Sequence, residues 1–193
     1  MTIPRLSILA AGVFVASLTS VAPVAAAPTS APVDGHTVHV QQDMTVAGFD
    51  AAVAEAHGYK IVTLPDGHQA SVPATARPGA QPDSQDTAHG NCGYSFVELD
   101  PLGHHNVELR TGFGVKLPAV SYTWLVEIQD RAGTSYQHWS GGLRFRSTWS
   151  GSRELHLTPP WVDAGVVPGR SSALLEDGEI CTSAGPWTFT GFD

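Results

Sequence analysis

Turn-forming residues recur at regular intervals through the second half of the chain. Between residues 91 and 193, clusters of Gly, Pro, Asp and Ser interrupt short apolar segments, at the spacing of about ten residues that is typical of an antiparallel β-sandwich or barrel. Residues 120–128 also alternate between apolar and polar side chains, with Trp124 on the apolar face and Glu127 on the other. The sequence therefore predicts a mainly β protein, an antiparallel β-sandwich with a barrel as the alternative, over residues 91–193.

The same pattern places the individual strands. They are expected at residues 93–99, 106–111, 120–128, 134–139, 143–149, 154–158, 162–167, 173–176, 179–183 and 187–192. The immunoglobulin fold needs a tryptophan soon after its first cysteine and a tyrosine two residues before its second. Here Trp124 lies far beyond Cys92, and Glu179 occupies the tyrosine position. Only the broader class, a β-sandwich of unspecified topology, is therefore expected.

Residues 27–73 are expected to form a small α+β unit. Residues 34–41 alternate as a strand does, and apolar side chains at positions 46, 49, 53 and 56 recur at helical spacing before a possible helix stop at Gly58. Two short strands should flank the turn formed by Pro65, Asp66 and Gly67. Residues 74–90 contain Pro, Gly, Gln and Ser with few large apolar side chains, which predicts a linker and few contacts between the two parts.

The first 26 residues have the three-part layout of a secretory signal peptide. The basic Arg5 precedes an apolar stretch over residues 6–18, and small residues follow as far as Ala27. The apolar stretch is shorter than the roughly 20 residues that a membrane-spanning helix needs. We therefore expect cleavage before Ala27 and a secreted mature protein, residues 27–193, without a membrane anchor.

The charge of the chain excludes some partners. Its formal net charge is −8, and it holds only 10 Lys and Arg residues. Binding to nucleic acid depends on a density of Lys and Arg that neutralises phosphates, and binding to anionic lipid depends on basic clusters. Neither partner is expected, and the acidity agrees with solubility outside a cell.

The two cysteines, Cys92 and Cys181, are expected to form a structural disulfide, because a free thiol in a secreted chain is exposed to oxidation. Closing so long a loop contributes about 4–5 kcal/mol in the chain-entropy model. A rival interpretation makes Cys92 a nucleophile, since residues 90–96 superficially resemble the surroundings of the papain-like nucleophile. The matching nucleophile position is Ser95, however, and too little chain follows it for the expected His and Asn.

Histidine offers a second candidate chemistry, because neutral imidazole binds zinc or copper. His104 and His105 lie on an expected turn and could meet His138 or His156 across a sheet. The spacing fits no His-Glu-x-x-His motif and no paired Cys motif, so surface histidines without a metal are the simpler interpretation. The chain also lacks a Gly-x-Ser-x-Gly elbow. No metal and no cofactor are expected.

Tryptophans carry the binding hypothesis. Trp124 is expected in the core, whereas Trp139, Trp149, Trp161 and Trp187 lie at strand ends or beside Gly and Pro. Such a residue either plugs the end of a sandwich or stacks against a sugar ring or a partner's side chain. Trp139, Trp149 and Trp161 are the candidate binding residues.

Residues 45–72, followed by Gly-Asn-Cys-Gly at residues 90–93, are similar to uncharacterised secreted proteins of GC-rich Gram-positive bacteria. This resemblance implies a secreted β-rich protein and brings no activity with it. The leading hypothesis is a non-enzymatic extracellular module that binds a cell-surface polysaccharide or protein. The alternative is a secreted hydrolase, for which Glu98, Asp100, Glu108 and Glu127 are carboxylates that sequence alone does not place.

Overall fold

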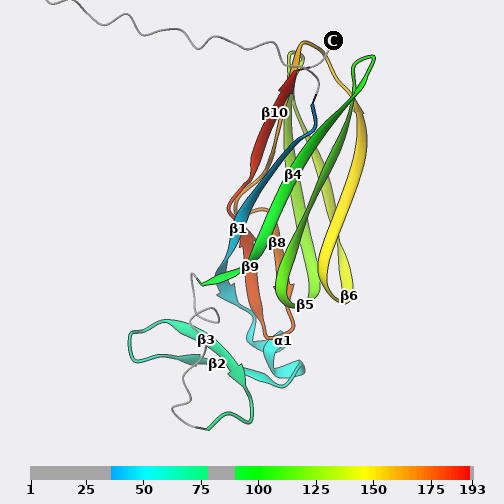
Figure 1. Ribbon diagram of the computed structural model, residues 1–193. Coiled ribbons are helices and arrows are strands. Elements are labelled where there is room, and N and C mark those ends of the chain that lie inside the picture. Colours follow the sequence, from blue (N-terminus) through cyan, green and yellow to red (C-terminus); the bar gives the residue numbers. More distant parts are fainter. Residues whose placement is uncertain (1–35, 78–89, 192–193) are drawn as a thin grey trace, which may run out of the picture. The chain divides into compact units, whose positions relative to one another are not determined.

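The computed structural model describes residues 36–77 and 90–191. The expected signal peptide, residues 1–26, lies outside these ranges, as does most of the expected linker. Within them the chain is almost entirely β-structure, and every strand pairing is antiparallel (Figure 1). No helix among the described residues is long and apolar enough to cross a membrane. The mainly β antiparallel class predicted from the sequence is confirmed.

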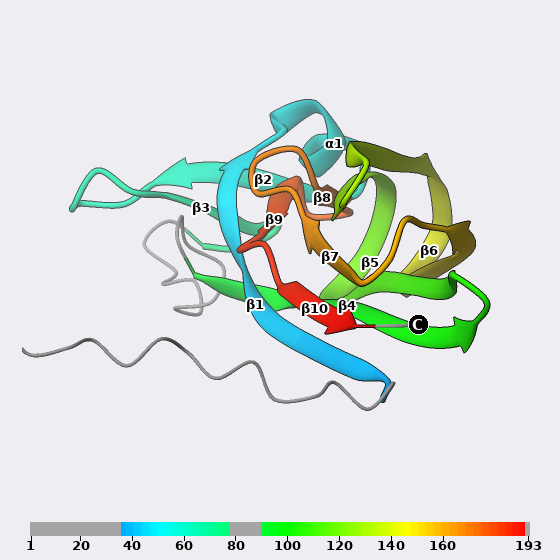
Figure 2. The same ribbon diagram turned by 90° about the horizontal axis from the view of Figure 1, so that it is seen from above.

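The elements follow one another as β1 (Val38–Phe49), α1 (Ala51–Ala56), β2 (Tyr59–Thr63), β3 (Gln69–Pro73), β4 (Asn91–Gly103), β5 (Asn106–Asp130), β6 (Gly133–His156), β7 (Trp161–Val166), β8 (Ser172–Leu175), β9 (Glu179–Ser183) and β10 (Trp187–Gly191). The sheet closes on itself, because β5 pairs with β4, β4 with β1, β1 with β9, β9 with β8, and β8 again with β5. These five strands form a barrel, which can be followed from above in Figure 2. Two further strands extend the sheet beyond β5, in the order β5, β7, β10.

Strands β5 and β6 form one long hairpin, which corrects the expected strand boundaries. The sequence predicts separate strands at 106–111 and 120–128 and breaks at 141–142 and 150–152, but both strands run through these positions. The pairing shifts register between Gly114 and Ser121, opposite Arg144 and Phe145, which have left-handed φ values of 47° and 63°. The hairpin therefore bends without breaking, because β5 and β6 pair with each other on both sides of the irregularity.

Strand β1 corrects the expected separation of the two halves of the chain. It lies between β4 and β9 and pairs with both, with Val40 opposite Val97 and Val46 opposite Cys181. Met44 and Val46 are fully buried in the core. The helical spacing expected over positions 46–56 is overridden in its first half, where Val46 and Phe49 belong to β1, and is borne out in its second half, where a helix spans Ala51–Ala56. Contacts between the N-terminal segment and the rest of the β-structure are thus extensive and apolar, not few and polar.

The small helix and the hairpin follow β1. Helix α1 begins after Asp50, whose side chain caps it by accepting a hydrogen bond from the Val53 amide at 3.1 Å. Strands β2 and β3 pair around the expected turn, where the Gly67 amide donates to the Leu64 carbonyl. The Ser71 hydroxyl donates to the Asp177 carbonyl at 2.7 Å, so the hairpin is tied to the turn between β8 and β9.

The expected disulfide is present. Cys92 at the start of β4 and Cys181 on β9 have Cα atoms 5.9 Å apart and are 89 residues apart in the chain. They lie on the two strands that flank β1. Both cysteines are buried in the main core cluster, together with Trp124, Val126 and Ile128 on the inner face of β5, as the alternation there predicts.

Candidate functional site

The outer surface of the β6, β5, β7 and β10 sheet holds the largest group of exposed aromatic side chains among the described residues. Cross-strand pairing places Tyr136, Glu127, Gly165 and Trp187 in one row across these four strands. The next row contains Thr134, Gln129, Asp163 and Phe189. We call this surface the aromatic face and define it as Tyr136, Trp161, Trp187 and Phe189 with Glu127, Gln129 and Asp163.

Gly165 has no side chain, and this lets the Trp187 ring lie against the sheet. A Cβ atom at Gly165 would be 2.7 Å from Cδ1 of the Trp187 indole, so only glycine leaves room for the ring. Trp187 nevertheless remains 55% exposed, and Tyr136 at the other end of the row is also 55% exposed. Phe189 is 42% exposed and stacks on Trp161, with ring centroids 6.5 Å apart and ring planes at 24°. The face therefore offers aromatic rings to solvent on both sides of its central strands.

Polar groups occupy the space between these rings. Glu127 accepts hydrogen bonds from the Gln129 amide and, at 3.3 Å, from the Tyr136 hydroxyl. Burial raises the pKa of Asp163, the charge of Glu127 raises it further, and a backbone hydrogen bond at Gln129 acts in the opposite direction. The two carboxylates are therefore close enough to repel each other.

A hollow of about 210 Å³ opens beside them. It is lined by Glu127, Gln129, Asp163 and Trp187, together with residues 165–168 and Gly185. The four strand segments of the face, residues 125–130, 133–139, 161–166 and 187–191, contain no Lys or Arg and three acidic residues: Glu127, Asp163 and Asp130, whose side chain accepts hydrogen bonds from the backbone of the adjoining turn. The site is thus concave, aromatic at its margins and negative at its centre.

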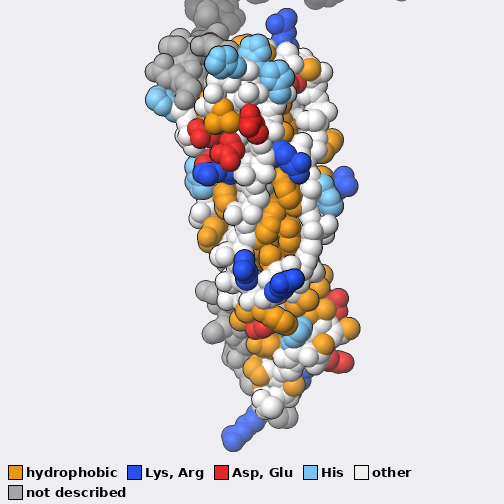
Figure 3. Space-filling model, turned by 90° about the vertical axis from the view of Figure 1, so that its right-hand side faces the viewer, with side chains coloured by type: hydrophobic (Ala, Val, Ile, Leu, Met, Phe, Trp, Pro, Cys, Tyr) orange, Lys and Arg blue, Asp and Glu red, His pale blue; other side chains and the backbone are white. Residues whose placement is uncertain are grey.

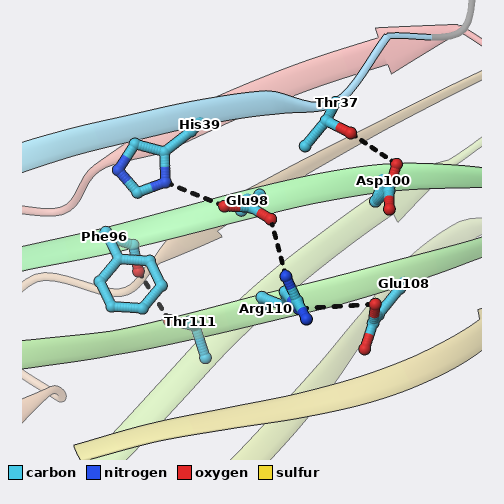
Figure 4. A network of polar contacts seen from close by, with 8 residues as sticks. All are labelled: Thr37, His39, Phe96, Glu98, Asp100, Glu108, Arg110 and Thr111. Atoms are coloured by element: carbon cyan, nitrogen blue, oxygen red, sulfur yellow. Dashed lines mark hydrogen bonds and ion pairs between the residues drawn. The ribbon is translucent and has the colours of Figure 1, made fainter.

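A second surface, on β1, β4 and β5, carries a ladder of polar side chains joined by hydrogen bonds and ion pairs (Figure 4). His39 Nδ1 lies 3.1 Å from Glu98 Oε2, and Arg110 lies 3.5 Å from both Glu98 and Glu108. The Thr37 hydroxyl donates to Asp100 at 2.6 Å. Each acidic side chain of this ladder therefore already has a hydrogen-bonding or ion-pair partner. Such exposed pairs individually contribute little to the stability of the fold.

An open depression of about 420 Å³ adjoins the ladder, lined by His39, Phe96, Glu98, Arg110 and residues 150–152. The imidazole of His39 stacks on Phe96, with centroids 5.4 Å apart. Three of the four carboxylates considered for hydrolysis, Glu98, Asp100 and Glu108, belong to this ladder, whereas Glu127 belongs to the aromatic face. The sequence did not separate these two environments.

The candidate tryptophans have different surroundings. Trp139 and Trp149 pack against the core cluster, and their ring centroids are 5.9 Å apart. The Trp149 ring also lies 4.6 Å from that of Tyr122, whose pKa is raised by burial. Trp149 also lines an open hollow of about 440 Å³ together with Phe113. Figure 3 shows a stripe of hydrophobic side chains along one face of the molecule. Trp161 is the candidate that joins the aromatic face.

The structure places the candidate cysteine, serine and histidine side chains as follows. Cys92 is in the disulfide, and Ser95 is buried with its hydroxyl 2.8 Å from that of Ser183. His105 and His156 do approach each other, with ring centroids 6.0 Å apart. Among the described residues, which exclude His89, no group of three or more His, Cys, Asp or Glu side chains could hold a metal ion.

Comparison with protein-family models, with curated proteins and with solved structures found no match to this chain.

Sequence reasoning missed most of the aromatic face. Trp187 and Phe189 alternate with two threonines, which indicates that the two rings share one side of a strand. That pattern does not say which side faces solvent, and here the buried side is the threonine side, with Thr188 and Thr190 almost fully covered. Tyr136 and Asp163 join the face only through cross-strand register, which no local pattern encodes.

Proposed function

We propose that this protein is a secreted, non-enzymatic module that binds a polysaccharide through the aromatic face. The observation that carries the proposal is the pair of exposed rings, Trp187 and Tyr136, at the two ends of a row whose centre holds the Glu127 carboxylate. Flat sugar faces stack on aromatic rings, and sugar hydroxyls donate hydrogen bonds to carboxylate and amide oxygens. Both kinds of group are present side by side on this surface.

The size of the face favours an extended ligand. Trp187 is on β10 and Tyr136 is on β6, so three strand spacings separate their backbones, a distance on the order of 14 Å. A single sugar ring does not reach both aromatic side chains, but a chain of linked rings does. This separation supports a polymer as the ligand and makes a small metabolite a poorer match.

The export signal expected at residues 1–26 and the disulfide support an extracellular location. Disulfides persist in oxidising compartments, and the bridge between Cys92 and Cys181 is buried and structural. An extracellular location gives the protein access to cell-surface polysaccharide.

Co-sedimentation with a panel of insoluble polysaccharides tests the proposal. The mature protein should bind at least one of them, and Trp187→Ala should weaken that binding by about ten-fold or more, as expected for a tryptophan that contacts the ligand directly. Phe145→Ala is the matched control, because Phe145 is 58% exposed but lies at the bend of β6, away from the face. Equal loss from both variants, or no binding to any polymer, would contradict the proposal.

One observation favours the hydrolase alternative. Glu127 and Asp163 are neighbouring carboxylates, and one of them has a raised pKa, as in enzymes that use one carboxylic acid and one carboxylate to cleave glycosidic bonds. Release of new reducing ends from a bound polysaccharide would favour this alternative, provided that Asp163→Asn and Glu127→Gln each abolish it. Binding without any release of reducing ends supports the non-enzymatic module.

A further inference from the structure

The carboxylates of the aromatic face lack a cationic partner. Among residues 36–77 and 90–191, neither Glu127 nor Asp163 forms an ion pair, and the nearest strand segments supply no Lys or Arg. On the polar ladder, by contrast, Arg110 forms ion pairs with Glu98 and Glu108, and Asp100 accepts a hydrogen bond from Thr37. The aromatic face is therefore a site at which negative charge is concentrated without internal compensation.

Aromatic rings flank this charge. The Tyr136 hydroxyl bonds directly to Glu127, and the Trp187 indole covers Gly165, the residue next to Glu127 across the sheet. The face of an aromatic ring attracts a cation, and a desolvated ammonium between rings and carboxylates gains from both interactions. Rings and carboxylates in this arrangement match an ammonium group more closely than a neutral hydroxyl.

We infer that the polysaccharide bound by the aromatic face carries free amino groups, so that its ammonium groups lie between Glu127, Asp163 and the flanking rings. This inference rests on the proposed function and adds the chemical class of the sugar. A neutral sugar leaves the repulsion between the two carboxylates in place, whereas an ammonium relieves it. A polymer of amino sugars also supplies flat rings for Trp187 and Tyr136, which a lysine side chain does not.

Calorimetric titration of the mature protein with two soluble oligomers of equal length tests the inference. One is an oligomer of N-acetylglucosamine, and the other is its fully deacetylated form, measured at mildly acidic pH where its amines are protonated. The deacetylated oligomer should bind about ten-fold more tightly or better, a difference that corresponds to about 1.4 kcal/mol. Glu127→Gln with Asp163→Asn should remove this preference, while Trp187→Ala should weaken binding of both oligomers.

Two controls distinguish binding at the aromatic face from nonspecific electrostatic attraction to an acidic protein. Glu154→Gln removes one exposed carboxylate from β6 outside the aromatic face, on the β1, β4 and β5 side, and should leave the preference unchanged. Oligolysine of equal charge should bind more weakly than the deacetylated oligomer. Equal binding of oligolysine, or equal loss in Glu154→Gln, would overturn the inference.

The failures of the two proposals are distinguishable. If the acetylated and deacetylated oligomers bind equally and Trp187→Ala weakens both, the preference for amino groups is wrong and the polysaccharide module stands. If neither oligomer binds and no polymer in the co-sedimentation panel binds, the proposed function itself is wrong.

Discussion

Asp163 is held on the sheet surface in conditions that favour its neutral form. Burial and then the Glu127 charge raise its pKa above the ordinary value, so the folded protein binds this proton more tightly than the unfolded chain does. The contribution of Asp163 to stability is therefore most favourable at low pH. It declines as the pH rises through the interval between the ordinary pKa and the raised one.

Asp163→Asn should consequently raise the unfolding temperature at neutral pH, since the asparagine has no charge to desolvate or repel. The gain should vanish in acid, below the ordinary carboxyl pKa of about 3.9. Thermal melts of both proteins across this pH range give the measurement. A gain that persists unchanged in acid would show that the effect does not come from the carboxylate charge.

Lys116 and Glu179 form an ion pair at the bend of β5. The ammonium of Lys116 lies 3.1 Å from Oε2 and 3.2 Å from Oε1 of Glu179, whose side chain is fully buried. Removing one partner of a buried pair costs about 3–5 kcal/mol, because the remaining charge loses its compensation. Lys116→Met should therefore destabilise the protein strongly by denaturant unfolding.

The double variant Lys116→Met with Glu179→Leu provides the control for this pair. Replacing both partners with apolar groups of similar size is often nearly neutral, so the double variant should recover most of the lost stability. A double variant less stable than Lys116→Met alone would mean that Glu179 contributes mainly through other contacts.

At the scale of elements, two glycines on β5 allow its neighbours to approach. A Cβ atom at Gly112 would overlap the backbone carbonyl oxygen of Trp149 on β6, whereas one at Gly114 would meet the Tyr94 ring, 2.6 Å from Cε1. A side chain can rotate away and a paired strand cannot. Gly112→Ala should therefore cost about 1–3 kcal/mol, and Gly114→Ala should cost less.

Gly48→Ala is the matched control, because a Cβ atom there meets nothing within 4 Å. It should leave the free energy of unfolding close to that of the unmodified protein. Denaturant unfolding of the three variants gives the order of their free energies of unfolding. A larger loss of stability in Gly114→Ala than in Gly112→Ala would contradict this account of the contact between β5 and β6.

Elements whose partners are adjacent in the chain are the ones that the sequence predicted well. The hairpin of β2 and β3 follows from its Pro65, Asp66 and Gly67 turn, and Trp124 follows from local alternation. The bend of the β5 and β6 hairpin was not predicted from the sequence. Gly141 and Gly142 are typical turn residues, and only the pairing with β5 keeps them within one strand. The aromatic face was not predicted either, because the register between strands far apart in the sequence places Tyr136 and Trp187 in one row.

At the scale of the whole molecule, the closure of the barrel depends on β1. This strand supplies the hydrogen-bonding partner for one side of β4 and one side of β9. The disulfide joins those two flanking strands, yet both cysteines come after β1 in the chain. The bridge therefore holds the frame around β1 but makes no covalent link to it.

A cut in the chain between residues 77 and 90 tests this dependence. We expect that mature protein carrying a specific protease site there, once cleaved, keeps both fragments together in size-exclusion chromatography without reduction. Strand pairing on both sides of β1 and the burial of Met44 and Val46 hold the fragments together, since no disulfide does. The nicked protein should still unfold in one cooperative transition.

The isolated fragment that starts at Gly90 should lack such a transition, because without β1 the edges of β4 and β9 are unpaired and the core is open. Val46→Asp is the control for specificity: it places a charge in the barrel interior, so the nicked variant should separate into its two fragments. If the unmodified fragments separate and the part from Gly90 onward melts cooperatively by itself, β1 is dispensable and the β-structure after residue 90 is an independent domain.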